Sequence, residues 1–284
     1  MLVYTLLFTL AHKNPSENKY VDMLLIWLTY LLKYGGLDKS DSIAVLADTR
    51  TFTYIQEIES LSLLVDTSPC SVEFICIEPP LTLSEGMVQR YRAFQKHTTY
   101  LYLDLDILTC KAMKDSIPTL ELKHLLVMPE GRLEDNNYAG LVLKGDIPSV
   151  CGFTSGWFAF TPCQEIQNLF EHIRSECIAQ SHTPFYTVDQ PFFNKWVWRS
   201  LSEVSSGITV LLMNDDIMEN NSFQPQPSTV FMNYCGEPGK GETHATKMVG
   251  LLCLQMLSTA SPSLTPDHPQ EASAGPPEPE HSRS

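Results

Sequence analysis

The feature that most constrains the fold is a regular alternation of short apolar runs with helix-like segments along the first 103 residues. The apolar runs predict strands at residues 2–10, 42–47, 73–77 and 100–103. The segments between them predict helices at residues 20–33, 51–64 and 86–96. Such an alternation is typical of a parallel sheet covered by helices on both faces, and ligands bind such sheets at the carboxyl ends of the strands.

The second half of the chain continues in the same style. Further strands are predicted at residues 124–128, 152–160 and 208–213, with helices near 163–180 and 191–201. The chain has 284 residues, of which 43% are hydrophobic, enough for one substantial core. We therefore predict a single α/β domain over residues 1–257, Rossmann-like, with a mostly parallel central sheet flanked by helices. Residues 258–284 are rich in Pro, Ser and Glu and predict a disordered tail.

Charge and hydropathy exclude some classes of protein and favour one compartment. The formal net charge of −14 argues against nucleic acid as a partner. The apolar start lacks the basic residues and small-residue cleavage site of a signal peptide, and no apolar run reaches the roughly 18 residues of a membrane span. The eight cysteines form no C-x-x-C pair and mostly neighbour apolar residues, as buried free thiols do. Together these features predict a soluble, cytoplasmic protein.

A pair of carboxylates follows the predicted strand at 100–103. The segment TYLYLDLDILTC places Asp104 and Asp106 two residues apart, so on an extended chain both point the same way. Adjacent carboxylates repel each other unless a cation bridges them, and oxygen ligands suit Mn²⁺ or Mg²⁺. Such an ion also chelates a diphosphate. The pattern therefore indicates a metal-dependent phosphate chemistry at the sheet edge, whereas the D-x-D pair alone could equally be a solvated strand end.

Three later segments add polar or small residues. FTSGWFAF, at 153–160, puts a small Ser-Gly pair before an aromatic strand, which lets a ligand approach the backbone. TVDQPFFN, at 187–194, opens a helix with polar groups that can point into a cleft or simply cap it. FMNYCGEPGKGETHATKM, at 231–248, is a Gly-rich, locally cationic segment suited to wrapping a diphosphate, or an ordinary surface loop.

The order of these segments resembles that of the type-A glycosyltransferases of the glycogenin and lipopolysaccharide-galactosyltransferase kind. The resemblance runs over residues 2–248 and rests on the strand, loop and helix at the start, then LYLDLDIL, FTSGWFAF, TVDQPFFN and NYCGEPGKG. It implies a nucleotide-diphospho-sugar transferase domain, a UDP-sugar donor, an Mn²⁺ or Mg²⁺ cofactor, and a glycan or protein acceptor. The activity implied is that of a hexosyltransferase.

The resemblance also implies roles for residues in the first half of the chain. Asp104 and Asp106 would hold the ion, and Asp104 would also contact the donor ribose. Thr9 and Tyr20 would meet the uracil, Tyr20 by stacking. Arg90, on the helix before the D-x-D strand, would contact the donor.

In the second half, Ser155 and Gly156 match small residues that line the sugar pocket. Asp189 and Gln190 match the segment that reaches the sugar and the acceptor, and both are candidate catalytic residues. Gln190 would orient the oxocarbenium-like sugar and Asp189 would bind sugar hydroxyls.

The late motif departs from the family pattern. The family has a histidine as third metal ligand where this chain has Asn233, with Gly236 in register behind it. His244, further along, is the other candidate for that ligand, and Lys240 and Lys247 are the two candidates for the family's basic residue.

The resemblance implies transfer with retention at the anomeric carbon, in which the departing phosphate accepts the proton. If a carboxylate acts as base instead, the reaction inverts, and Asp189 or Glu130 would serve. Two other classes of function stay open. One is a sugar nucleotidyltransferase, although its usual Gly-rich loop after the first strand is absent here. The other is a non-catalytic protein that binds a nucleotide-sugar or a protein partner.

Overall fold

The computed structural model describes residues 1–94, 97–143, 147–182, 187–202, 206–222 and 225–235. The predicted tail at 258–284 therefore lies outside the described residues, as does the segment from 236 onward.

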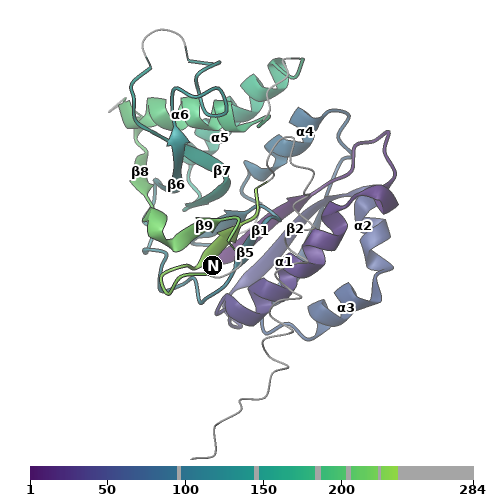
Figure 1. The fold of residues 1–284 in the computed structure, drawn as a ribbon. Coiled ribbons are helices and arrows are strands. Elements are labelled where there is room, and N and C mark those ends of the chain that lie inside the picture. Colours follow the sequence, from purple (N-terminus) through teal and green to yellow (C-terminus); the bar gives the residue numbers. More distant parts are fainter. Residues whose placement is uncertain (95–96, 144–146, 183–186, 203–205, 223–224, 236–284) are drawn as a thin grey trace, which may run out of the picture.

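A seven-stranded sheet forms the centre of the molecule, in the order β3-β2-β1-β4-β7-β6-β8 (Figure 1). All pairings among β3, β2, β1 and β4 are parallel, β6 pairs parallel with β8, and only β7 runs against its neighbours. The predicted mostly parallel α/β sheet is thus confirmed. Its strands are β1 (Leu2–Leu7), β2 (Ser42–Asp48), β3 (Ser71–Ile77), β4 (Tyr100–Leu103), β6 (His124–Arg132), β7 (Cys151–Phe160) and β8 (Thr209–Leu212).

A second, three-stranded sheet was not predicted from the sequence. It has the order β5-β10-β9, formed by Ile107–Thr109, Phe231–Asn233 and Met218–Asn220. Strands of three residues carry too little periodicity to be recognised alone, and β5 is more than 100 residues away from β9 and β10 in the sequence. The small sheet places β10 beside the segment that follows the D-x-D pair.

Helices cover both faces of the central sheet because its strands bury both faces. Within β1 and β4, alternate residues enter opposite cores: Val3 and Leu101 join one, Tyr4 and Tyr102 the other. The first core also holds α1, α2, α3 and the small sheet, whereas the second holds α5 and α6 (Figure 1). These helices are α1 (Tyr20–Tyr34), α2 (Thr49–Gln56), α3 (Glu59–Asp66), α5 (Gln164–Ala179) and α6 (Gln190–Ser202).

Two helix predictions were wrong in extent. The segment 51–64 is split into α2 and α3, and the segment 86–96 is not one helix: α4 (Leu83–Met87) is followed by a single 3-10 turn, η2 (Val88–Arg90). A capping box at Thr82 starts α4 earlier than expected. Tyr91 leaves the helical region because its ring is buried between Phe158 and Phe193. Tertiary packing therefore ends this helix before the sequence pattern does.

Two further properties concern the predicted location. Among the described residues, none of the helices combines the length and apolar character needed to cross a bilayer. Of the cysteines in the described part of the chain, only Cys70 and Cys177 are buried, so most are not the core thiols that their apolar neighbours suggested.

Candidate functional site

The carboxyl ends of β1, β2 and β4 meet at one edge of the sheet, and polar residues follow each of them. The Asp48 carboxylate caps α2 by accepting from the amides of Arg50 and Thr51, and it also accepts from the Thr9 amide at 2.7 Å. The Thr51 hydroxyl donates to the Thr9 hydroxyl oxygen at 2.7 Å. The loop after β1 is thereby fastened to the start of α2.

A cavity of about 410 Å³ opens at this edge. Its volume is in the range of small-molecule sites. Five residues that the sequence had assigned to one site, from four separate segments, line this cavity: Thr9, Tyr20, Arg90, Asp104 and Asp106. Asn18 lines it as well. Tyr20, the first residue of α1, is 48% exposed, so its ring stands at the surface of this cavity.

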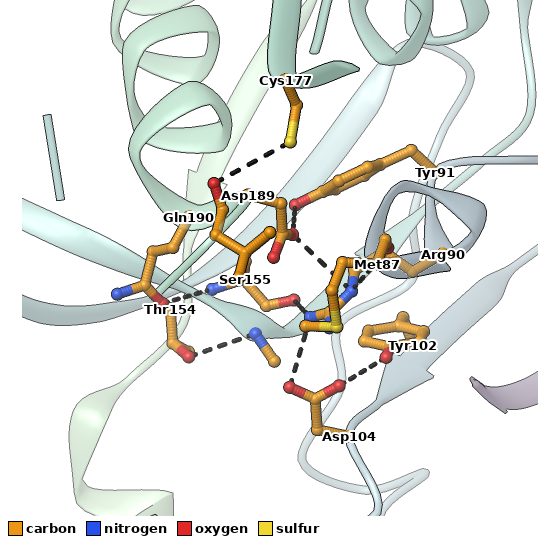
Figure 2. A network of polar contacts seen from close by, with 12 residues as sticks. Met87, Arg90, Tyr91, Tyr102, Asp104, Thr154, Ser155, Cys177, Asp189 and Gln190 are labelled. Atoms are coloured by element: carbon orange, nitrogen blue, oxygen red, sulfur yellow. Dashed lines mark hydrogen bonds and ion pairs between the residues drawn. The ribbon is translucent and has the colours of Figure 1, made fainter. Parts of the chain in front are cut away.

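Asp104 has partners on both carboxylate oxygens (Figure 2). The Tyr102 hydroxyl donates to Oδ1, and the Arg90 guanidinium lies 3.2 Å from Oδ2. Burial raises the pKa of Asp104 to about 6, with the Asp106 charge adding to the rise, while Arg90 and the Tyr102 hydrogen bond act in the opposite direction. Two side chains therefore hold the carboxylate in place, and its pKa depends on the charged groups around it.

The Asp104 carboxylate can lie against Gly156 because this residue has no side chain. The Gly156 backbone carbonyl accepts from the Asp104 amide at 2.8 Å, because β4 and β7 pair antiparallel here. A Cβ on Gly156 would lie 2.8 Å from Asp104 Oδ2. The small residue predicted to line a sugar pocket therefore contacts the first aspartate directly.

Arg90 is 1% exposed and lies between two acidic side chains from distant segments (Figure 2). Its Nη1 donates to the Ser155 carbonyl at 3.0 Å as well as to Asp104, and its Nε lies 3.6 Å from Asp189 Oδ2. The guanidinium also lies 4.9 Å from the centre of the Tyr102 ring. Arg90 is on η2 rather than on the long helix that the sequence predicted.

Asp189 is fully buried and is absent from the lining of the 410 Å³ cavity. Its Oδ2 accepts the Tyr91 hydroxyl and pairs with Arg90. Burial raises the pKa of Asp189, and Arg90 and the Tyr91 hydrogen bond counteract that rise. In this structure Asp189 pairs with Arg90 and does not line this cavity.

Gln190 and Asn194 fasten the start of α6 to β7. Gln190 Oε1 accepts from the Ser155 amide at 3.0 Å, and its Nε2 donates to the Asn137 carbonyl at 3.1 Å. Asn194 both accepts from the Phe153 amide and donates to the Phe153 carbonyl, each at 2.7 Å. Gln190 is 8% exposed and, like Asp189, is absent from the lining of the 410 Å³ cavity.

The second aspartate lies beside β10. The Asp106 carbonyl accepts from the Tyr234 amide at 2.8 Å, and Asn233 pairs with Ile107 across the small sheet. The structure thus brings Asn233 to the D-x-D segment, as the family register implies. In the described part of the chain, no group of three or more His, Cys, Asp or Glu side chains is arranged to hold a metal ion. Gly236, Lys240, His244 and Lys247 lie outside the described residues.

A second cavity, of about 500 Å³, lies at the end of β6, next to the small sheet. Burial raises the pKa of Glu130 in its wall; hydrogen bonds with Tyr138 and Thr154 lower that pKa, and the Asp106 charge raises it. The Thr154 hydroxyl, which bonds to Glu130, also accepts from the Gly156 amide. Two hydrogen bonds therefore connect Glu130 to Gly156, the residue that contacts Asp104. Among the described residues this cavity is lined by four carboxylates and no basic side chain: Glu130, Asp215, Asp216 and Glu219.

Sequence reasoning missed four residues that organise the site. Tyr102 had a local signal, because it lies on the same strand face as Asp104. Asp48, at the end of a strand and the start of a helix, matched the pattern of an N-cap. Tyr91 and Asn194 had no such signal, since each acts on a residue at least 41 positions away.

Comparison with known proteins supports the fold. No protein-family model matches the chain, and no curated protein sequence does. Among solved structures, the chain is similar to an apo structure of WbbM, a bifunctional glycosyltransferase, with a TM-score of 0.56 and 10% identity. The alignment covers 89% of this chain and 49% of that one, so the chain spans about half the length of the solved structure. The chain has a glycosyltransferase fold, and at this identity the likeness is one of fold.

Proposed function

We propose that the chain is a metal-dependent glycosyltransferase that moves a hexose from a UDP-sugar to an acceptor hydroxyl. The observation that carries this proposal is the 410 Å³ cavity at the carboxyl edge of the sheet, because it joins Thr9, Tyr20, Arg90 and the D-x-D pair. In a sheet of this kind that edge is where ligands bind. Tyr20 offers an exposed ring for a base, and the aspartates offer oxygen ligands for a cation.

The residues present fit Mn²⁺ or Mg²⁺ in a shared site. Asp104 and Asp106 supply hard oxygen donors, and Gly156 lets the Asp104 carboxylate lie against the backbone, because a Cβ there would be 2.8 Å from Oδ2. Two carboxylates do not complete a coordination sphere, so diphosphate oxygens would supply further ligands, with Asn233 or His244 as the candidate third protein ligand. When bound, the ion would neutralise charge on the leaving UDP.

The chain's own residues would orient the donor, and the pairing of Asp189 with Arg90 would keep Asp189 from taking the acceptor's proton. Arg90 provides a fixed positive charge at the inner wall of the cavity. Gln190, which is held at the first turn of α6 by the Ser155 amide and the Asn137 carbonyl, would orient the sugar. Asp189 is buried and paired with Arg90, which leaves it unsuited to act as a general base and supports transfer with retention.

The acceptor would enter from the second cavity. Its carboxylates and the amides of Asn220 and Gln226 can hydrogen-bond hydroxyl groups. Its lining repels anions, which favours a neutral glycan or a protein hydroxyl as acceptor.

Calorimetric titration with a panel of UDP-sugars, with and without Mn²⁺, tests the proposal. We expect one UDP-sugar to bind only with the ion, and Asp104→Asn to abolish that binding and the transfer while the chain still folds. Asp115→Asn, which removes an exposed carboxylate, is the matched control. Wild-type binding that persists in Asp104→Asn would contradict the metal site.

Product analysis separates the alternatives. A transferase releases UDP, whereas a sugar nucleotidyltransferase releases pyrophosphate. Donor binding without release of either, across a broad acceptor panel, would favour a non-catalytic binding protein. The anomeric configuration of the product, read by NMR, decides between retention and inversion.

A further inference from the structure

We propose that Tyr91 is a positioning residue of the donor site: through its hydrogen bond to Asp189, it holds the Arg90 guanidinium between Asp189 and Asp104. The sequence marked Arg90, Asp104 and Asp189 but gave Tyr91 no role. The inference rests on the proposed function only in linking this arrangement to donor binding.

The contact between Tyr91 and Asp189 joins two buried groups. Both side chains are at most 1% exposed, and the Tyr91 hydroxyl donates to the same oxygen, Oδ2, that faces Arg90 (Figure 2). The Tyr91 ring is fixed by stacking on Phe158 and Phe193, at 5.6 and 5.8 Å between ring centres. A rigid hydroxyl therefore stabilises the ionised form of a carboxylate whose pKa is raised by burial.

Arg90 depends on that carboxylate being ionised. Its Nε lies 3.6 Å from Asp189 and its Nη1 lies 3.2 Å from Asp104, so one cation is shared by two anions. If Asp189 became neutral, Arg90 would pair with Asp104 alone. Arg90 would then compete with a divalent cation for Asp104 Oδ2, which is the oxygen beside Gly156.

The substitution Tyr91→Phe removes the hydroxyl and keeps the stacked ring. Tyr4→Phe is a matched control, because the Tyr4 hydroxyl is equally buried and also bonds to Arg90, but donates to its backbone carbonyl at 2.7 Å. Both changes remove one buried hydroxyl next to the same residue. Only Tyr91→Phe removes a hydrogen bond to a carboxylate that pairs with the Arg90 guanidinium.

Two measurements on the full chain test the role. The first is the ¹H–¹⁵N signal of Arg90 Nε–H, identified by its loss in Arg90→Lys; the second is the calorimetric affinity for UDP with Mn²⁺. We expect Tyr91→Phe to shift the Arg90 signal and to weaken Mn²⁺–UDP binding roughly tenfold, the scale of one hydrogen bond to a charged group. Tyr4→Phe should lower the melting temperature but leave both readouts close to those of wild type.

An unshifted Arg90 signal in Tyr91→Phe would overturn the proposal, and so would a shifted signal with wild-type affinity. Asp189→Asn, which keeps the shape but not the charge, should reproduce the effect and serves if Tyr91→Phe does not fold. A wild-type chain that binds no Mn²⁺–UDP would refute the proposed function. In that case the Arg90 signal would still decide whether Tyr91 positions Arg90.

Discussion

At the scale of single residues, the site depends on space as much as on charge. Asp104 can sit between Tyr102 and Arg90 only because position 156 has no side chain. The same glycine carbonyl fixes the Asp104 backbone. Close packing of this kind means that one methyl group can displace a charged side chain.

We therefore expect Gly156→Ala to weaken Mn²⁺-dependent UDP binding by about tenfold or more, since the new Cβ would meet Asp104 Oδ2 at 2.8 Å and push the carboxylate aside. Calorimetry with UDP and Mn²⁺ measures the effect. Phe160→Leu, a core change in the same strand, should lower stability but keep the affinity. Equal affinity in Gly156→Ala and wild type would show that Asp104 does not need this space.

At the scale of elements, α6 is tied to β7 by side-chain amides that replace strand pairing. β4 pairs with β7 only from Trp157 to Phe160, and the register of β7 against β6 shifts on either side of Phe153. Asn194 instead satisfies both the N–H and the C=O of Phe153, from the first turns of α6. The buried side-chain amide thus makes the two backbone hydrogen bonds that a neighbouring strand would otherwise make.

Asn194→Ala should cost about 2–4 kcal/mol in the free energy of unfolding, because it leaves the buried N–H and C=O of Phe153 without the side-chain amide that bonds both. Urea denaturation followed by circular dichroism gives this value. Asn168→Ala, in an exposed position on α5, is the control and should change stability by less than about 0.5 kcal/mol. A similar small change in Asn194→Ala would mean that the strand end finds other partners.

The start of β2 carries an ion pair with a predictable pH dependence. Asp41 is 2% exposed and lies 2.5 Å from Lys114 Nζ. Burial alone would raise the pKa of Asp41, but hydrogen bonds from Lys114 and the Asp38 amide lower it by more. Because the folded-state pKa lies below the unfolded value of about 3.9, the unfolded state binds more protons in acid.

Asp41→Asn should therefore destabilise the protein by about 1–2 kcal/mol at pH 7. The difference from wild type should shrink as the pH falls below about 4, through the folded-state pKa, where wild-type Asp41 is also neutral. Urea midpoints at pH 7 and pH 3 measure it, with Asp115→Asn as control. A difference that stays constant with pH would assign the effect to shape and not to charge.

At the scale of the whole molecule, the central sheet separates two cores that do not share side chains. Leu28 on α1 belongs to one, and Phe170 on α5 belongs to the other. Figure 1 shows α1 over the β1–β2 part of the sheet and α5 over the β6–β7 part. The cavity of about 410 Å³ lies at the carboxyl edge of this sheet.

Leu28→Ala and Phe170→Ala should each cost about 2–5 kcal/mol in stability, and the double variant should cost their sum within about 0.5 kcal/mol. Both residues are at most 2% exposed, so each change opens a cavity, and the sheet keeps the two cavities apart. Urea unfolding of all four proteins tests this; milder single changes, Leu28→Val and Phe170→Leu, replace the originals if the double variant does not fold. An interaction energy above about 1 kcal/mol would indicate one continuous core.

The sequence by itself determined the order of the main strands and helices and the location of the D-x-D pair. Short apolar runs, and carboxylates at the end of one such run, are local signals that need no partner to be recognised. The tertiary structure alone decided the small sheet, the early end of the helix at Arg90, and the contact between Tyr91 and Asp189 across 98 residues. Such contacts depend on which strands become neighbours, and that is settled by the packing of whole elements.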